Sequence, residues 1–160
     1  MNWKKIIVRA GLGLLVVTVL IVGGLGVLSW LQQKPADLGV AQGRLRPCPQ
    51  SSNCVCSEYP SAPDPLPPIP FNGSPEQAMN RIETIVSGMP RTSIISQSDN
   101  YLHAEFRSAL FRFIDDAEFR IDPEASVIHF RSASRVGRSD LGANRERMRK
   151  IKQQFDSNDA

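Results

Sequence analysis

An uncharged, apolar stretch from Ala10 to Leu31 is the feature that most constrains how this chain can fold. Rising ~1.5 Å per residue, a helix of that length just spans a hydrocarbon core of about 30 Å. Trp3 and Trp30 bracket the stretch, and indole rings favour the headgroup layer of a bilayer. The sequence therefore predicts one transmembrane helix over residues 10–31 that anchors the rest of the chain.

A cleaved signal peptide is the main alternative to an uncleaved anchor. Signal peptides have an apolar core of about 7–15 residues, followed closely by a small-x-small site. Here the apolar run is longer, and residues 29–32, Ser-Trp-Leu-Gln, make a poor cleavage site. A lipoprotein would need a cysteine at the end of the run, whereas the first cysteine is Cys48. We therefore expect the helix to be retained.

The charges that flank the apolar stretch predict its orientation. The N-terminal flank carries Lys4, Lys5 and Arg9, and the C-terminal flank offers only Lys34, balanced by Asp37. The positive-inside bias makes residues 1–9 a cytoplasmic tip at the inner (cytoplasmic) membrane and puts the following domain in the periplasm or another extracytoplasmic space. These flanks hold four of the 19 Lys and Arg residues and one of the 16 Asp and Glu residues, so the remainder is neutral. The pI of 9.0 thus reflects the basic residues that flank the apolar stretch and orient it in the membrane. Nucleic-acid binding is not expected.

The part beyond the anchor is long enough for one modest domain with its own core. Residues 32–47 are predicted to form a polar tether. Six of the residues from 60 to 70 are prolines, which excludes a helix or a central strand there. We expect a rigid surface strap over residues 60–70, with a docking ligand for a protein partner in the envelope as the alternative.

Periodicity predicts two helices around a run of strands. Ser74 and Gln77 have capping-box spacing, apolar residues then recur at three and four positions, and Gly88 ends the helix. A last amphipathic helix covers about residues 140–155. Alternating strands are predicted at 92–97, 101–108, 111–121 and 127–134, with a possible extra strand near 69–71. Because the connections are short, we predict an α+β two-layer sandwich: an antiparallel meander of about four or five strands with both helices on one face.

Three cysteines, Cys48, Cys54 and Cys56, lie within nine residues. Outside the cytoplasm, neighbouring thiols usually oxidise. A Cys48–Cys54 bridge would close a small loop and fix its shape, and Cys56 could be free, could replace Cys54, or could cross-link two chains. A metal site would need a fourth ligand, and His103 and His129 lie far along the chain, so no metal is expected.

The first candidate site is the sheet face opposite the helices. Strand alternation places on it His103, Glu105, Arg107, Glu118, Arg120, His129 and Arg131. Imidazoles among carboxylates and guanidiniums could support acid–base catalysis or bind an anion, and the alternative is an ordinary water-exposed face laced with charge pairs. The candidate catalytic residues are His103, Glu105, Asp115 and Asp116. Neighbours on a strand point to opposite faces, so Asp115 and Asp116 do not converge, and we expect them in a turn or bulge.

The second candidate site is the run from Ser132 to Arg145. There a strand leads through a glycine-bearing turn into a helix N-terminus, so free backbone N–H groups, the helix dipole and arginines would suit a phosphate or carboxylate. The candidate ligand-binding residues are Arg131, Ser132, Ser134, Arg135, Gly137, Arg138, Ser139, Asn144 and Arg145. The alternative is ordinary capping of the helix by Ser139 or Asp140, and the charge of Asp140 would repel an anion.

Four segments resemble one known family. They are residues 46–54 (RPCPQSSNC), 101–108 (YLHAEFRS), 111–119 (FRFIDDAEF) and 128–145 (IHFRSASRVGRSDLGANR). Over about residues 44–156 the chain is similar to the domain of unknown function 1499, which brings no established activity with it. The resemblance implies shared positions at Cys48, Asn53, Cys54, His103, Glu105, Phe106, Asp115, Asp116, Glu118, Arg131, Ser132, Ser134, Arg135, Gly137, Ser139, Asp140, Leu141, Gly142, Asn144 and Arg145. Members more often have serine where this chain has Cys56, which favours the Cys48–Cys54 bridge.

The motifs of common enzyme classes are absent from the sequence. It has no G-x-S-x-G, H-E-x-x-H, P-loop or G-x-G-x-x-G, and no cofactor is expected. We therefore expect a membrane-anchored binding or accessory module for a small anionic ligand, a lipid headgroup or a partner protein. The alternatives are a hydrolase-like acid–base enzyme using His103 with nearby carboxylates, and a structural subunit of a membrane complex.

Overall fold

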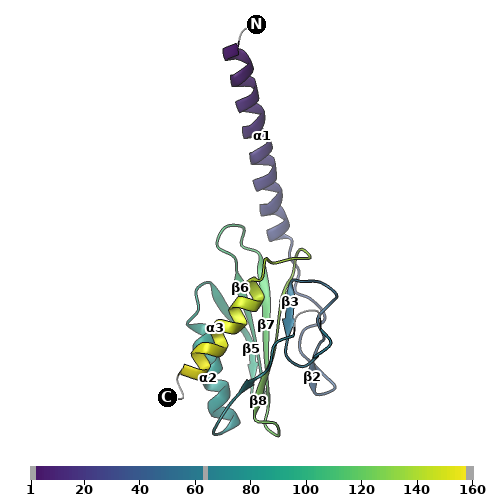
Figure 1. Ribbon diagram of the computed structural model, residues 1–160, viewed down its shortest axis with the longest axis vertical. Coiled ribbons are helices and arrows are strands. Elements are labelled where there is room, and N and C mark those ends of the chain that lie inside the picture. The colour runs from purple at the N-terminus through teal and green to yellow at the C-terminus, as the bar shows by residue number, and fades with distance from the viewer. Residues whose placement is uncertain (1–2, 63–64, 158–160) are drawn as a thin grey trace.

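A long first helix projects from a small domain in the computed structural model, which describes residues 3–62 and 65–157 (Figure 1). This helix, α1, runs Trp3–Trp30. Its apolar stretch, Ile6–Trp30, is 25 residues long, and none of it is buried against the domain. By length and composition it is the one helix among the described residues that could cross a membrane.

The domain is built on a six-stranded antiparallel sheet. Five of its strands lie in the order β3-β8-β7-β6-β5, and β4 also pairs with β8. The strands are β3 (Cys54–Cys56), β4 (Ile69–Pro70), β5 (Thr92–Ser98), β6 (Tyr101–Arg107), β7 (Ile114–Asp122) and β8 (Val127–Ser134). Consecutive strands from β5 to β8 are neighbours joined by short turns, which confirms the predicted meander.

Two helices, α2 (Pro75–Ser87) and α3 (Ala143–Ser157), cover one face of this sheet (Figure 1). The predicted capping box is present: the Gln77 backbone N–H donates to the Ser74 hydroxyl, and the Gln77 side chain accepts from the Ser74 N–H. Apolar side chains from both helices and the sheet form one core, which includes Ile82, Val86, Phe119, Phe130, Ile151 and Phe155. The α+β architecture with both helices on one face is therefore confirmed.

Two local predictions about these elements are wrong. β7 begins at Ile114 because the chain turns at Arg112, whose φ is 59°, so Asp115 and Asp116 lie within a strand rather than in a turn or bulge. The last helix begins at Ala143, three residues late, because Asp140 caps it from outside. Its carboxylate accepts from the backbone N–H groups of Gly142 (3.0 Å) and Asn144 (2.7 Å).

The sheet face opposite the helices is buried, and the expectation of a water-exposed face is wrong. His103 is 1% exposed and Glu118 is fully buried. The reason is that residues 35–47, here called the cover segment, lie across this face and form a small hairpin of β1 (Val40–Ala41) and β2 (Arg44–Leu45). The backbone N–H of Gly39, just before this hairpin, donates to Glu118 (2.6 Å). Two-residue strands carry no period that a sequence pattern could reveal.

Candidate functional site

A chain of ion pairs crosses the covered face from β6 to the end of β8. Glu105 accepts from Arg107 (2.8 Å) and from Arg135 (2.5 Å) through different oxygens. Arg135 also donates to both oxygens of Asp116, at 2.7 Å each. The Nε2 atom of His103 lies 2.8 Å from the Asp116 carboxylate. Only Arg107 is substantially exposed, so this ion chain is a buried structure in which each charge has a partner.

The surroundings of Asp116 keep it ionised. Burial acts to raise the pKa of its carboxyl, but hydrogen bonds from Arg135 and His103 outweigh this and hold the pKa below its ordinary value of 3.8. The hydrogen bond with Asp116 also raises the pKa of the Arg135 guanidinium. The stability contributed by Asp116 is thus present above pH 3.8 and is lost as the pH falls through the lowered pKa. Such a carboxylate is a poor proton donor near neutral pH.

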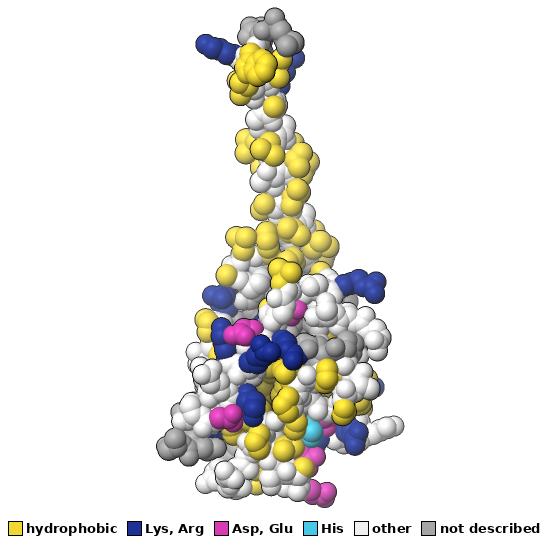
Figure 2. Space-filling model, viewed as in Figure 1, with side chains coloured by type: hydrophobic (Ala, Val, Ile, Leu, Met, Phe, Trp, Pro, Cys, Tyr) yellow, Lys and Arg dark blue, Asp and Glu magenta, His cyan; other side chains and the backbone are white. Residues whose placement is uncertain are grey.

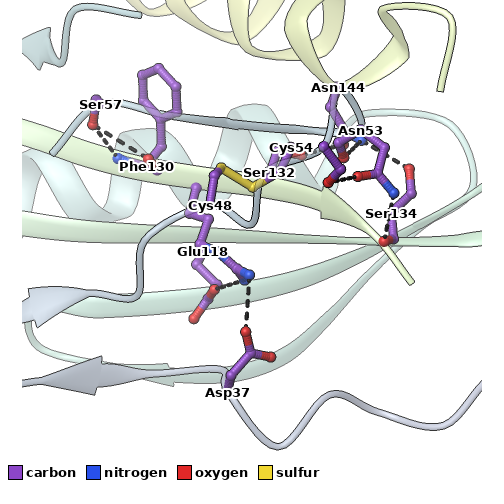
Figure 3. The surroundings of a disulfide bond; sticks show 12 residues. Asp37, Cys48, Asn53, Cys54, Ser57, Glu118, Phe130, Ser132, Ser134 and Asn144 are labelled. Atoms are coloured by element: carbon purple, nitrogen blue, oxygen red, sulfur yellow. Dashed lines mark hydrogen bonds and ion pairs between the residues drawn. A yellow bond between two sulfur atoms is a disulfide. The ribbon is translucent and has the colours of Figure 1, made fainter. Parts of the chain in front are cut away.

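A second buried cluster is centred on Glu118 and Arg131. Arg131 donates to Glu118 (3.1 Å) and to Asp37 of the cover segment (3.2 Å). Glu118 accepts in addition from the Tyr101 hydroxyl (2.8 Å), and burial together with the charge of Glu118 raises the pKa of that phenol well above its ordinary value. Figure 3 shows Glu118 and Asp37 at opposite ends of this arrangement. The cover segment is therefore fastened to the sheet by charge.

A buried amide network joins the disulfide loop, residues 48–54, to β8 and α3. The Asn144 side-chain amide donates to the Asn53 carbonyl (3.1 Å) and the Ser134 hydroxyl (3.0 Å), while its oxygen accepts from Ser132 (2.5 Å). The Asn53 side chain in turn donates to the Gly137 carbonyl (2.7 Å). Asn144 is 1% exposed, and Figure 3 shows it beside Asn53. These bonds fix the loop that leaves β8.

Cys48 and Cys54 form the disulfide that the sequence and its family resemblance favour, with their Cα atoms 5.6 Å apart (Figure 3). Cys56 is a free, buried thiol opposite Arg131 in the β3–β8 register. Burial raises the pKa of this thiol, which disfavours the reactive thiolate. The disulfide is thus the element that shapes residues 49–53, and Cys56 is a packing residue.

A cavity of about 400 Å³ lies where these features meet. Its walls are the cover segment at Pro35 and Asp37, the disulfide loop, and the end of β8 with the turn that follows it. Three arginines, Arg131, Arg135 and Arg138, are among its lining residues, together with the acidic residues Asp37 and Asp116. It is therefore a polar cavity with an excess of cationic side chains.

A larger hollow of about 740 Å³ lies elsewhere, between the start of α2 and the β5–β6 turn. Its charged lining consists of Glu76 and Asp99, and no Lys, Arg, His or Cys contributes to it. It contains none of the candidate catalytic or ligand-binding residues predicted from the sequence. We therefore place the candidate site in the smaller cavity, where buried charge and several chain segments converge.

The structure brings together part of each predicted site. Ser134, Arg135, Gly137 and Arg138 line the cavity with Arg131, and Asp116 joins them from the first site. Ser132 and Asn144 are buried on the helix side of the sheet, and Ser139 and Arg145 lie outside the lining. His103 and Glu105 reach the cavity only through Asp116 and Arg135.

Two other candidate residues lie away from the cavity. Asp115 points to the helix side, where it accepts from Arg147 of α3 (2.6 Å). His129 lies 3.3 Å from the Ser57 hydroxyl and does not meet His103; burial lowers the pKa of its ring. Within residues 3–62 and 65–157, no group of three His, Cys, Asp or Glu side chains could hold a metal ion.

Sequence reasoning missed the contribution of the cover segment. Asp37 entered only as a charge beside the anchor, yet it pairs with Arg131, ninety-four residues away. The family resemblance identified Asn53 as a shared position, but it did not predict a role for this residue. Only the folded chain places both residues on the cavity.

A comparison with known families finds a match over most of the chain that follows the apolar helix. The model of the family described as "Protein of unknown function (DUF1499)" matches residues 44–155, well over half of the chain. The chain belongs to this family. No curated protein and no solved structure matches it.

Proposed function

We propose that this protein is a membrane-anchored binding module that holds a small anionic group, a phosphate or a carboxylate, in the cavity at the end of β8. The observation that carries the proposal is the guanidinium of Arg138. Arg138 is an exposed residue of the cavity lining, and its guanidinium has no hydrogen-bond or ion-pair partner among the described residues. An arginine fork without a partner is suited to bidentate binding of an oxyanion.

Arg131 supports the same chemistry from the cavity wall. Its side chain is 5% exposed, and its Nε atom is buried without a hydrogen-bond partner in the described part of the chain. A buried donor without a partner is costly, so an acceptor in the cavity would stabilise it. Asp37, whose side chain is 56% exposed, already sets a carboxylate against this guanidinium. This contact supports an oxyanion as the group that the wall would bind.

The geometry favours this proposal over an acid–base enzyme. A catalytic histidine must come within hydrogen-bond reach of a substrate, whereas His103 is 1% exposed and does not line the cavity. Asp116 does line it, but two donors from Arg135 hold it as a carboxylate. We assign the ion chain of His103, Asp116, Arg135 and Glu105 to positioning the cavity wall.

We also propose that the N-terminus is cytoplasmic and the domain extracytoplasmic, in the inner membrane. Lys4, Lys5 and Arg9 on one flank of the helix support that orientation, and the disulfide suits an oxidising compartment. A reporter active only in the cytoplasm should be silent when fused to the C-terminus, while the same reporter at the N-terminus should be active. The reverse pattern would refute the orientation.

Thermal unfolding of the full chain in a nonionic detergent tests the anion site. Inorganic phosphate and glycerol 3-phosphate are the probes, with glycerol and chloride salts as controls. Saturation to about 100 times Kd should stabilise the domain by about 2.7 kcal/mol, which raises Tm by several degrees. Arg138→Ala should lose most of this gain because it removes the unpaired guanidinium.

The matched control is Arg149→Ala, which removes an exposed arginine of α3 that lies outside the cavity. It should keep the full phosphate-dependent rise in Tm. An equal rise in both variants, or no rise in the parent protein with either probe, would rule out the cavity as the anion site. In the second case a structural role in a membrane complex would become the leading alternative.

A further inference from the structure

Two loops lie at the end of the domain that meets the anchor (Figure 1). One, residues 108–113, joins β6 to β7, and the other, residues 135–142, joins β8 to α3. The bases of the loops are hydrogen-bonded to each other, because the Arg135 N–H donates to the Ile114 carbonyl (3.1 Å). Both loops therefore belong to one surface.

The anchor is fastened to that same surface. The Gln32 side chain, two residues after the end of α1, accepts from the backbone N–H of Ile114 (2.8 Å). A helix that spans the hydrocarbon core leaves it near Trp30, so Gln32 lies in the headgroup layer. The hydrogen bond from Ile114 to the Gln32 side chain therefore holds Ile114 and the two neighbouring loops close to the bilayer surface.

Each of these loops exposes a leucine. Beyond the segment Trp3–Leu31, the two most exposed large hydrophobic side chains among the described residues are Leu141, at 98%, and Leu110, at 78%. Figure 2 shows hydrophobic side chains clustered where the C-terminal end of α1 meets the domain, with Lys and Arg side chains on both sides of the cluster. Arg112 is an exposed arginine in the first of the loops. Apolar residues beside cations are suited to the interface of a bilayer with anionic lipid.

Both leucines are held in place by their loops. The Phe113 N–H donates to the Ser108 hydroxyl (2.9 Å) and the Ser108 N–H to the Phe113 carbonyl (2.9 Å), which closes the first loop around its tip at Leu110. Leu141 has a φ of 55°, and the turn that contains it is fixed by the Asp140 carboxylate. A turn that holds a large apolar side chain almost fully in water, in a left-handed backbone conformation, is unfavourable unless that side chain has an apolar environment to enter.

We propose that the domain rests directly on the membrane that α1 crosses, with Leu110 and Leu141 inserted into the interface and Arg112 at the level of the lipid phosphates. The cover segment and the sheet then extend away from this contact, and the β7–β8 turn lies at the end of the domain opposite the anchor (Figure 1). β7 runs from Ile114 to Asp122, and nine strand residues at about 3.3 Å each separate its two ends by roughly 30 Å. The contact does not depend on the proposed anion site.

Tryptophan fluorescence of the full chain in phosphatidylcholine–phosphatidylglycerol vesicles tests this contact. Trp3→Phe and Trp30→Phe first remove both natural tryptophans. Leu110→Trp and Leu141→Trp then each place one indole in a loop at an exposed position, so neither change touches the core. The matched control is Ala125→Trp in the exposed β7–β8 turn.

The two loop tryptophans should emit at shorter wavelength than the control and should be quenched severalfold more strongly by lipids brominated near the headgroup end of their acyl chains. Quenching at either loop position no stronger than in Ala125→Trp would overturn the proposal. A blue-shifted emission without quenching by bromolipid, accompanied by cross-linking of two chains through these loops, would also overturn it and would assign the surface to a second copy of this chain.

Discussion

Replacing Glu118 with alanine should lower the free energy of unfolding of the domain by about 3–5 kcal/mol. Glu118 is fully buried, and its carboxylate accepts from Arg131, Tyr101 and the Gly39 backbone. The alanine variant leaves the Arg131 guanidinium, whose side chain is 5% exposed, with only the exposed carboxylate of Asp37. It also releases the cover segment, since the bond to Gly39 is one of the contacts that hold this segment on the sheet. Urea unfolding of the full chain in detergent, followed by far-UV circular dichroism, measures the loss.

Glu124→Ala is the matched control for this prediction. Glu124 lies in the exposed β7–β8 turn on the same strand pair, and its replacement should change the free energy of unfolding by no more than about 0.5 kcal/mol. Glu118→Gln keeps the acceptor oxygen and the shape but not the charge, so its cost should fall between the two. If Glu118→Ala were no more harmful than Glu124→Ala, the cover segment would not be fastened to the sheet as described.

Asn144→Ala should cost roughly 2–4 kcal/mol, because each buried group left without a partner costs about 1–3 kcal/mol. The lost amide serves the Asn53 carbonyl and the hydroxyls of Ser132 and Ser134, all within the junction of the disulfide loop, β8 and α3. Unfolding in urea gives the free energy. Hydrogen exchange should in addition show faster opening of residues 135–142, because the network fixes the base of that loop.

Asn80→Ala provides the comparison within a helix. Asn80 is exposed in α2, and alanine has the higher helix propensity, so this variant should be neutral or slightly stabilising. If the Asn144 and Asn80 variants had equal stability, the amide network would have no energetic role. The Asn144 amide would then not be what fixes the loop that leaves β8.

Much of the fold could be predicted because it depends on local periodicity. Alternation in β6 separates Leu102 and Ala104, in the core, from His103 and Glu105, on the other face. The capping box at Ser74 located the start of α2 to the residue. At the start of α3, the Asp140 carboxylate accepts from the backbone N–H groups of Gly142 and Asn144, which is the capping that the sequence offered as the alternative to an anion site.

The candidate site was less predictable, because its decisive contacts are long-range and made by segments without periodicity. Arg135 was expected to meet a ligand, but Glu105 and Asp116 occupy it, a pairing that depends on how β6, β7 and β8 lie side by side. Polar alternation in the strands predicts a water-exposed face, but the cover segment lies on that face. The pairing of Asp37 with Arg131, which holds the cover segment there, is visible only in the folded chain. Of the expected arginines on the cavity wall, Arg138 is the one left without a partner among the described residues.

Isothermal titration calorimetry of the full-length Asp37→Asn variant in nonionic detergent measures its affinity for glycerol 3-phosphate. This affinity depends directly on whether an anion binds beside Arg131. Asp37 lines the cavity and competes for the Arg131 guanidinium, so its neutralisation removes both a repulsion and a competitor. A partly exposed ion pair is worth up to about 1 kcal/mol, so affinity should rise by up to about fivefold over the parent protein. Unchanged or weaker binding in Asp37→Asn would contradict the account, because an anion held beside Arg131 must respond to the loss of that carboxylate.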